Sequence, residues 1–424
     1  MKEINLPFRL SIVLTQTDVH WVEAQLLEQR TKLFLAALQQ VLAHIEGEVV
    51  RRATACGRCG GRLVHNGRVP LVLETLLGRV EYVRQRLRCR SCGADMYPLD
   101  EALGLLPGSG STLGVRERAL WAAVEVSYAK AGEFLAKFAG LEVSHGSIHR
   151  WAQEEGRLVE VQERSAQEAT FGAHPSGRVE RPPGPARLYV QVDGTLVHER
   201  PAGEMECKVG IVYSQRAAVS RRRIALLDKQ TYASFENAER FGERFWVRCA
   251  AAGAADAAQI VFVSDGAPWI HTVQRAYFPE ALVVLDPWHL ARQIQLAWGA
   301  ESRGLVERCL ADAWRGDIRS LVRRLRGRLA QERDRERRVG GRDLLGYVEA
   351  NAEGIANLAR FEATGSGAME KTVDILVARR YKKRGMTWSR RGSGALMRLR
   401  LLKANGQWDA YWANRREAYA RRAA

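Results

Sequence analysis

The sequence predicts a mixed α/β protein whose sheet is built from the second half of the chain. Three β-type runs, LYVQVDG, CKVGIVYS and RRIALLD, follow one another without a long helix between them. Two further runs, IVFVSDG and LVVLD, then alternate with helical stretches. Three consecutive strands followed by strands that alternate with helices indicate a single mixed sheet.

Composition sets the size and the charge of the molecule. The chain has 424 residues, of which 46% are hydrophobic, and this supplies enough apolar side chains for two or three cores. Lys and Arg outnumber Asp and Glu by 65 to 48, a net charge of +17 that favours a polyanionic partner. Charge alone does not separate nucleic acid from an acidic membrane.

The sequence offers no clear targeting or membrane segment. The N-terminus has only a short apolar patch, and no run of about 18 consecutive apolar residues occurs. We therefore expect neither a signal peptide nor a membrane span. The expected location is cytoplasmic, with no membrane partner.

Residues 1–50 are expected to form an N-terminal helical region. Behind Thr17 as N-cap, the stretch from Asp18 to about Val50 repeats apolar residues at helical spacing without proline. The pattern fits one long amphipathic helix or a helix pair. Packing against the rest of the protein is the preferred interpretation over a dimerising coil, because the heptad spacing is not sustained.

Residues 51–100 carry two Cys-x-x-Cys pairs with a predicted hairpin between them. Apolar and polar residues alternate in RVPLVLETLLGRVEYVRQRLR, and the Leu77-Gly78 break marks the turn. Gly60 and Gly93 follow the two pairs and favour tight turns. The four cysteines are Cys56, Cys59, Cys89 and Cys92.

Two such turns brought together by a hairpin predict a tetrahedral zinc site in a zinc-ribbon-like domain. Four protein ligands leave no open position on the metal, so its role would be structural and not catalytic. Free thiols and redox catalysis are the alternatives. The other three cysteines are scattered and suit buried positions in a reducing compartment.

Residues 101–167 are expected to form a helical DNA-binding domain. In AKAGEFLAKFAGLEVSHGSIHRWAQEEGR, a helix with Phe134, Leu135 and Phe138 inward ends at Gly140, and a second helix begins behind Ser144 as N-cap. An ordinary helical hairpin is the alternative to a helix-turn-helix. In the DNA-binding interpretation, the residues presented to the groove are His145, Ser147, His149 and Arg150.

A stretch rich in Gly, Pro and charge, EATFGAHPSGRVERPPGPAR, marks the expected boundary between the two halves of the chain. Such a composition does not sustain a helix. The expected division of the chain is therefore 1–50, 51–100, 101–167, a linker at 168–186, and 187–424.

Two aspartates end predicted strands. Asp193 follows LYVQV and precedes Gly194, and Asp265 follows IVFVS and precedes Gly266. Either one alone is explained by turn chemistry, since Asp-Gly often ends strands. The chain is also basic and carries the two cysteine pairs, called here the cysteine clip, and a helix-turn-helix. In this context the two aspartates together fit phosphoryl transfer by two divalent metal ions, because carboxylate oxygens bind such ions well at neutral pH.

The motifs VQVDGTLV, VSDGAPWI, VLDPWHLAR and GSGAMEKTVDILVARRYKKRGMTWSRRGSGALMRLRLL resemble the DDE transposases of bacterial insertion sequences, in the Mutator-like group. The cysteine clip and the helix-turn-helix resemble the DNA-binding region of that family, which leaves only the first 50 residues outside the resemblance. The resemblance implies an RNase H-like mixed sheet with a helical insertion, at about 288–363, before the last acid.

The resemblance also assigns site residues by position. Asp193, Asp265 and Glu370 would be the three catalytic acids that hold two Mg²⁺ or Mn²⁺ ions. Asp286 and His289 match a motif near the active site of the family, where an auxiliary role and a structural role are both open.

The third acid is the one with competitors, because Glu349, Glu353 and Glu362 also precede the basic C-terminus. Glu370 is preferred because Gly365 and Gly367 let the backbone approach DNA closely and because a basic run follows. This run is expected to contact DNA, with a solvated charged surface as the alternative. Its residues are Arg379, Arg380, Lys382, Lys383 and Arg384.

The predicted function is that of a DNA transposase, which binds the ends of its element, cuts there and joins the freed end to target DNA. The partners would be DNA and a second copy of the chain, in a homodimer or higher oligomer at the synapse, near the bacterial nucleoid. A DNA-binding regulator with an inert core is one alternative. A metal-dependent nuclease or junction resolvase is the other.

Overall fold

The computed structural model describes residues 4–6, 11–105, 110–172, 184–220, 223–360 and 367–423. The chain forms two compact units, Met1–Trp151 with Gln407–Ala424, and Ala152–Gly406. This division differs from the one expected from the sequence. The boundary falls inside one long helix, and the last helix returns to the first unit.

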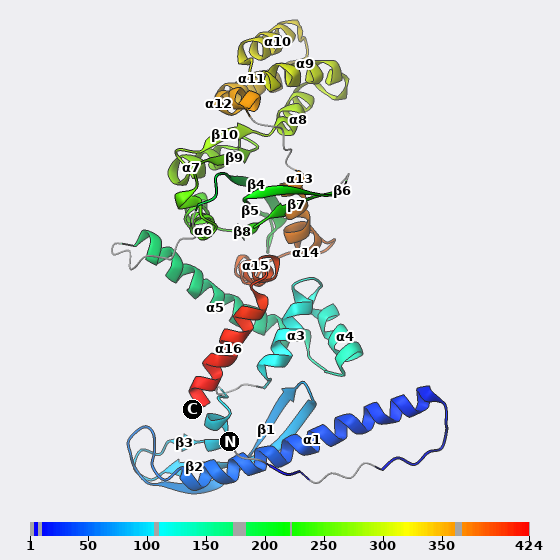
Figure 1. Ribbon diagram of the computed structural model, residues 1–424, viewed down its shortest axis with the longest axis vertical. Helices are drawn as coiled ribbons and strands as arrows, with labels where there is room; N and C mark the ends of the chain where they lie inside the picture. The colour runs from blue at the N-terminus through cyan, green and yellow to red at the C-terminus, as the bar shows by residue number, and fades with distance from the viewer. Residues whose placement is uncertain are drawn as a thin grey trace. The chain divides into compact units, whose positions relative to one another are not determined.

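The first unit begins with α1 (Val19–Arg52), which is one continuous helix and not a pair (Figure 1). Its N-cap is Asp18 and not Thr17 as predicted, because the Asp18 carboxylate accepts a hydrogen bond from the Trp21 amide at 2.9 Å. By length and composition alone, α1 is the one helix of the described residues that is long and apolar enough to cross a membrane.

The predicted hairpin is present and supports the second half of α1. Strands β1 (Leu63–Thr75) and β2 (Gly78–Cys89) are antiparallel, and Thr75 pairs with Gly78 across a two-residue turn. Gly78 has a φ of 119°, which explains the glycine at the break. A short strand, β3 (Asp95–Met96), completes the sheet, and Leu42 of α1 packs on the hairpin as predicted.

Helices make up the rest of the first unit. They are α2 (Pro98–Ala102), α3 (Leu113–Ala123), α4 (Tyr128–Ala139), the first turns of α5 (His145–Phe171), and α16 (Trp408–Ala423). Helix α5 continues through the start of the expected linker, and residues 173–183 of that linker lie outside the described residues.

The second unit is a mixed α/β structure around a five-stranded sheet of order β10-β9-β4-β5-β8. Strands β4, β5 and β8 are antiparallel neighbours, whereas β9 and β10 run parallel to β4 on its other side. The strands are β4 (Leu188–His198), β5 (Glu204–Tyr213), β8 (Gln230–Ser234), β9 (Ile260–Ser264) and β10 (Leu282–Leu285).

One predicted strand forms but lies outside the five-stranded sheet. The run RRIALLD forms β7 (Arg223–Leu227), which pairs only with β6 (Gln215–Ser220) in a separate ribbon. The third strand of the meander is instead β8, whose residues QTYAS lack an apolar run. Its burial comes from tertiary packing under α6 and α15, and a sequence pattern does not register that packing.

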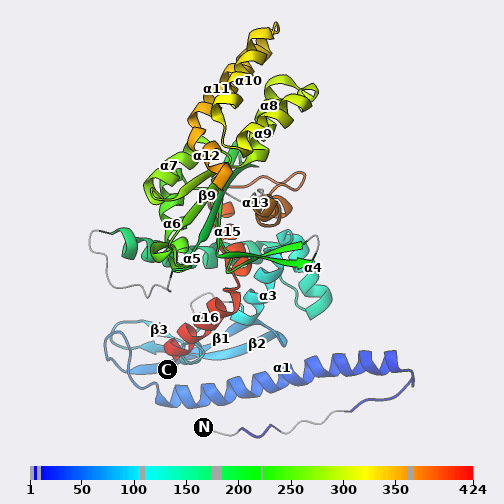
Figure 2. The same cartoon turned by 45° about the horizontal axis from the view of Figure 1, so that its top comes forward.

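Helices cover both faces of the sheet. Figure 2 shows α6 (Ala238–Ala251) and α7 (Pro268–Tyr277) on one side and α13 (Gly367–Val373) on the other. Helix α13 lies against β4 and β5. It is followed by a π-helical turn (Asp374–Ala378), α14 (Arg379–Tyr381) and α15 (Arg390–Ala404).

The predicted helical insertion lies between β10 and α13, and its core is continuous with the sheet. Leu290, Trp298 and Leu344 of the insertion belong to one buried cluster with Val263 of β9 and Val284 of β10. Residues 361–366 at its end lie outside the described residues. Its helices are α8 (Pro287–Trp298), α9 (Arg303–Trp314), α10 (Ile318–Gln331), α11 (Arg335–Ala350) and α12 (Ala352–Ala356). Three short 3₁₀ turns are Ala254–Asp256, Ala300–Ser302 and Asn357–Arg360.

Candidate functional site

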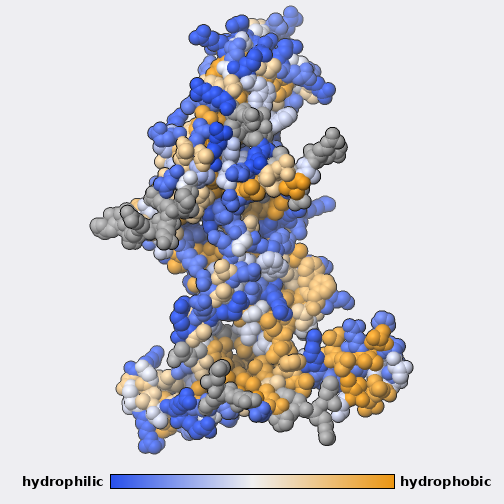
Figure 3. Space-filling view, in the orientation of Figure 1, coloured by the Kyte–Doolittle hydropathy of each residue, from blue (hydrophilic) through white to orange (hydrophobic). Residues whose placement is uncertain are grey.

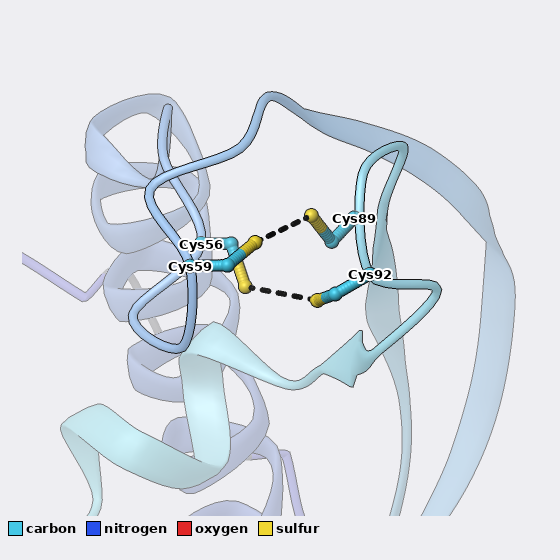
Figure 4. Close-up of side chains that lie close together, drawn as sticks. All are labelled: Cys56, Cys59, Cys89 and Cys92. Carbon is cyan, nitrogen blue, oxygen red and sulfur yellow. Dashed lines mark hydrogen bonds between the residues drawn. The ribbon is translucent and has the colours of Figure 1, made fainter.

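The four predicted cysteines converge at the open end of the β1–β2 hairpin (Figure 4). Their sulfur atoms all lie within 4.8 Å of one another, with Cys56 Sγ 3.8 Å from Cys92 Sγ and Cys59 Sγ 3.5 Å from Cys89 Sγ. A tetrahedral ion with sulfur ligands at about 2.3 Å requires sulfur separations of about 3.8 Å. The cluster therefore has the geometry of a structural metal site, such as one for zinc.

The two cysteine loops have the same backbone geometry. The Gly60 amide donates to the Cys56 carbonyl at 2.8 Å, and the Gly93 amide donates to the Cys89 carbonyl at 3.0 Å. Both glycines have a positive φ, 70° and 71°, as the sequence predicts for tight turns. Gly61 is also required, because a Cβ there would lie 2.9 Å from Cys89 Sγ.

Backbone amides favour the ionised form of one of these thiols. The amides of Cys92 and, to a smaller extent, Ser91 donate hydrogen bonds that lower the pKa of Cys89 to about 6. At Cys56 the Arg58 amide donates to Sγ at 3.4 Å. Thiolates are the form that binds a metal ion, so the loop of Cys89 favours ligation by this sulfur atom.

The second cluster lies at the carboxyl end of the parallel strands. The last paired residues are Val192 of β4 with Ser264 of β9, and Ser264 with Leu285 of β10. The next residue after each of these strand positions is an aspartate. The amide of Asp286, which follows β10, donates to the Ser264 carbonyl at 2.8 Å. The three neighbouring parallel strands therefore place three aspartates side by side, namely Asp193, Asp265 and Asp286.

The sequence predicts that Asp193 ends its strand, but the strand continues beyond it. Strand β4 continues to His198, because β5 keeps pairing with it after β9 has ended. Asp193 therefore lies inside a strand whose other neighbour is missing, where its side chain is half-buried. Asp265 does end β9, as predicted.

The three carboxylates are close enough to affect one another. Burial raises the pKa of Asp193, against the hydrogen bond that the Gly194 amide donates to it at 2.7 Å. The negative charges of Asp265 and Asp286 raise it further, and His289 opposes them. Carboxylates crowded together in this way are typical of sites that bind a cation.

The loop after Asp265 is fixed by the helical insertion. The Asp265 carboxylate accepts a hydrogen bond from the Ala267 amide at 2.8 Å, and its carbonyl accepts one from the Tyr347 hydroxyl at 2.6 Å. Gly266 has a φ of 82°, and a Cβ there would lie 2.7 Å from the amide carbon of Asn351. No sequence pattern points to Tyr347 and Asn351, since both residue types occur routinely on helices.

Asp286 and His289 form a pair beside the other two aspartates. One oxygen of Asp286 caps α8 by accepting from the Trp288 amide at 3.0 Å, and the other lies 2.9 Å from His289 Nδ1. This hydrogen bond raises the pKa of His289, and the charges of Asp265 and Asp193 add to it. Asp286 is 2% exposed, and its two oxygens are both engaged, one as the cap of α8 and the other on His289 Nδ1.

Glu370 is exposed on α13, the helix that lies against β4 and β5. Side chains along a strand alternate between its two faces, so Asp193 and Thr195 lie on the same face of β4. The Thr195 hydroxyl accepts a hydrogen bond from Lys382, which directly follows α14. The segment that carries Glu370 and Lys382 thus covers the Asp193 face.

The three predicted catalytic acids do not converge as closely as the four cysteines do. Among the described residues, Asp193, Asp265 and Glu370 do not form a group with all ligand oxygens within 4.8 Å of one another. Of the competing acids, Glu349 pairs with Arg326 at 3.3 Å and Glu353 is exposed in the insertion. Glu362, and Gly365 near Glu370, lie outside the described residues.

The predicted helix-turn-helix has its turn and its cap. Gly140 ends α4 with a φ of 62°, and Ser144 Oγ accepts from the Ser147 amide at 3.1 Å. Leu135 is buried as predicted, but Phe138 is 80% exposed and Phe134 lies at the surface. Those two were wrongly assigned to the core, because α4 buries only the face of Ala131 and Leu135.

The candidate DNA-contacting residues of α5 differ in their surroundings. His145, His149 and Arg150 are exposed, and the His149 ring lies edge-on to Tyr128 with centroids 5.2 Å apart. Ser147 is engaged at the helix start, with its hydroxyl 3.1 Å from that of Ser144.

In the basic C-terminal run, Lys382, Lys383 and Arg384 are exposed, and Arg379 forms an ion pair with Asp374 at 2.8 Å. Arg380 corrects the prediction, because it is 1% exposed and stacks on Trp388 at 4.9 Å from the ring centre. A guanidinium in that position supports the fold and does not reach phosphate.

Comparison with known proteins assigns the chain to a family. A family model described as "Uncharacterised protein family (UPF0236)" matches residues 16–416. The chain belongs to UPF0236. Because the match spans both compact units, the cysteine cluster and the aspartate cluster are parts of one family architecture.

Relatives of this UPF0236 protein occur in Caldanaerobacter subterraneus subsp. tengcongensis. One UPF0236 protein is 23% identical over 79% of the chain and 68% of its own length, and its name combines eleven locus designations. A second is 21% identical over 79% of the chain and 64% of its own length, so that the chain spans less than two thirds of that relative.

Proposed function

We propose that this UPF0236 protein is a DNA transposase that cuts and joins DNA at the aspartate cluster. The observation that carries the proposal is the strand register, which brings Asp193 and Asp265 to neighbouring positions at one edge of the sheet. Ligand sites of open α/β sheets lie at the carboxyl ends of parallel strands. The basic composition supports a nucleic acid as the substrate.

The fold supports the same proposal. An antiparallel meander of three strands, followed by two strands parallel to the first on its other side, is the arrangement that we expect of an RNase H-like core. The helical insertion between β10 and α13 occupies the position that the resemblance to DDE transposases implies. We therefore infer an RNase H-like catalytic core for the second unit.

The donor set fits Mg²⁺ or Mn²⁺. Asp193 and Asp265 offer hard oxygen atoms. Burial, and after it the negative charge of Asp265, raises the pKa of Asp193, and a cation would relieve the repulsion between the two carboxylates. Glu370 would complete the set by approach of α13, which already lies against β4. Bound divalent ions would supply activation of the attacking oxygen and stabilisation of the leaving oxygen.

The remaining groups of the site would position the catalytic side chains and neutralise the charge of the DNA phosphate. Tyr347 and Asn351 hold the loop of Asp265, and Asp286 holds His289 by its Nδ1. A cationic His289 beside the carboxylates would attract a DNA phosphate. Lys382, on the same face of the sheet as Asp193, offers a second positive charge.

The cysteine cluster is proposed as a structural zinc site within the DNA-binding region. All four ligand positions come from the protein, so the ion would stabilise the loops and would take no part in cutting DNA. The α4–α5 turn is the proposed reader of the element ends, through His145, His149 and Arg150.

The relatives give independent support for mobility. The name of one relative combines eleven loci of a single genome. A mobile element that copies or moves its own gene accounts for many loci with one protein product, whereas a regulator needs only one.

The test is DNA cleavage and joining in vitro with Mg²⁺ or Mn²⁺, with the DNA that flanks the gene as substrate. We expect nicking at the element ends and joining of a pre-cut end to target DNA. Asp193→Asn and Asp265→Asn should lower both rates by at least about a hundredfold while end binding changes only a few-fold. Asp256→Asn, an exposed aspartate in the same unit, is the matched control and should remain active.

Other outcomes would assign the site differently. Metal-dependent nicking without joined products would indicate a nuclease or resolvase. Specific binding without cleavage under either metal would indicate a DNA-binding regulator. Unchanged cutting in both aspartate variants would remove the cluster from the mechanism.

A further inference from the structure

The N-terminal half of α1 has an apolar face that no described part of the chain covers. Val19 is 70% exposed and Phe34 is 50% exposed, and Figure 3 shows hydrophobic surface over this end of the helix. An exposed apolar strip of this kind marks an interaction surface. The residues that line its shallow groove are Val19, Val22, Glu23, Leu26, Leu27, Arg30, Leu33 and Phe34.

Two opposite charges lie within this strip. Glu23 and Arg30 share the face with the apolar residues, and neither has an ion-pair or hydrogen-bond partner among the described residues. They are seven positions apart, about 10 Å along the helix axis, so they do not pair with each other. The strip therefore presents one acid and one base, on either side of Leu26 and Leu27.

We propose that this strip binds the same strip of a second copy of the chain, with the two helices antiparallel. A two-fold axis between Leu26 and Leu27 brings Glu23 of each chain opposite Arg30 of the other. It also brings Val19 of each chain opposite Phe34 of the other. The surface is thus self-complementary in both charge and apolar character, as an isologous interface requires.

Other occupants fit the strip less well. Parallel helices in register would bring Glu23 against Glu23 and Arg30 against Arg30, which is repulsive. A lipid bilayer would have to bury both charges. The chain's own residues ahead of the helix do not cover it where they are described, since Val13 and Leu14 are themselves 82% and 64% exposed.

This inference goes beyond the proposed function, because it concerns assembly of the chain in the absence of DNA and of divalent metal. The test is sedimentation velocity of the full-length protein over a series of concentrations that reaches roughly 100 µM, because buried area alone does not fix the affinity of an interface. We expect a reversible monomer–dimer equilibrium for the wild type.

Charge reversal then identifies the interface. Glu23→Arg and Arg30→Glu should each weaken the dimer by at least about tenfold, because each introduces two like-charge contacts. A mixture of the two variants should dimerise again, since the two chains then carry complementary charges at both positions. This recovery distinguishes a specific antiparallel pairing from a general loss of stability.

The matched control is Glu28→Arg, which makes the same charge change on the opposite face of the helix, where Glu28 pairs with Lys32 at 2.6 Å. It should dimerise like the wild type. A wild type that stays monomeric throughout, two reversals that leave the dimer intact, or a mixture that stays monomeric would each contradict the proposal. Association of the wild type with phosphatidylcholine vesicles, retained in Glu23→Arg, would assign the strip to a membrane instead.

Discussion

At the scale of single residues, Glu46 is the group that attaches α1 to the hairpin. Its carboxylate accepts from the Tyr82 hydroxyl at 2.8 Å and from the Gln85 amide at 2.6 Å, and it pairs with Arg68 at 2.9 Å. The residue is only 6% exposed, so these partners replace the water that the carboxylate lost.

We predict that Glu46→Ala destabilises the first unit by about 2–4 kcal/mol, because it leaves the Tyr82 hydroxyl and the Gln85 amide without their acceptor and removes the partner of Arg68. Urea unfolding followed by circular dichroism measures the loss. Glu28→Ala on the exposed side of the same helix is the control and should cost less than about 0.5 kcal/mol. Equal effects of the two substitutions would show that Glu46 has no special role.

Residue-level predictions from the sequence succeeded where chemistry and spacing decide, and failed where tertiary packing decides. The glycines after each cysteine pair and the cap at Ser144 follow from local backbone geometry. Arg380 was assigned to the surface because charge usually lies there, but the indole of Trp388 provides a buried partner. No local pattern in the sequence reveals such a partner.

At the scale of elements, the second half of α5 packs closely on α15 within the second unit. A Cβ at Gly156 would lie 2.6 Å from the backbone of Ala395, and Arg398 of α15 pairs with Glu163 of α5 at 2.9 Å. The glycine therefore permits a close helix–helix approach and is not a flexible position.

Gly156→Ala should accordingly destabilise the second unit by about 1–3 kcal/mol, because one of the two helices must move. Thermal unfolding measures the change. Gly146→Ala in the same helix has open space around its Cβ, with Ser144 Oγ 3.9 Å away as the nearest atom, and should be neutral or stabilising by up to about 1 kcal/mol. A neutral Gly156→Ala would mean that α5 and α15 are not in close contact.

The proposed zinc ion would stabilise the two cysteine loops, and this can be tested directly. Elemental analysis should find one zinc ion per chain, and Cys89→Ser should lose it. Chelation should unfold the loops and the adjoining ends of β1 and β2, measured as faster amide hydrogen exchange there, because the loops have little core of their own. Unchanged exchange after complete zinc removal would contradict a structural role for the metal.

Element prediction was best for the strands that carry strong apolar runs, β4, β5, β9 and β10, and for the helical insertion. It missed β8 because this strand is short and polar and is held by α6 and α15. The prediction placed β7 in the main sheet because the apolar residues of a strand in a separate two-stranded ribbon resemble those of a core strand.

At the scale of the whole molecule, the sequence predicts two aspartates at the ends of strands but not how they come together. Asp193 and Asp265 are 72 positions apart, 265 minus 193, and only the parallel pairing of β4 with β9 makes them neighbours. The contribution of Tyr347 and Asn351 comes from the insertion, whose packing no local motif announces.

The central claim is that Asp193 is a metal ligand for DNA cutting, and exchange of its oxygen atoms for sulfur tests this most directly. We would measure nicking of the element end by Asp193→Cys in Mg²⁺ and in Mn²⁺. The account predicts loss of nicking in Mg²⁺ and at least about a tenfold recovery in Mn²⁺, since sulfur ligands favour the softer ion. Asp193→Ala should recover in neither ion. Undiminished nicking by Asp193→Cys in Mg²⁺, or equal recovery of Asp193→Ala in Mn²⁺, would contradict the account.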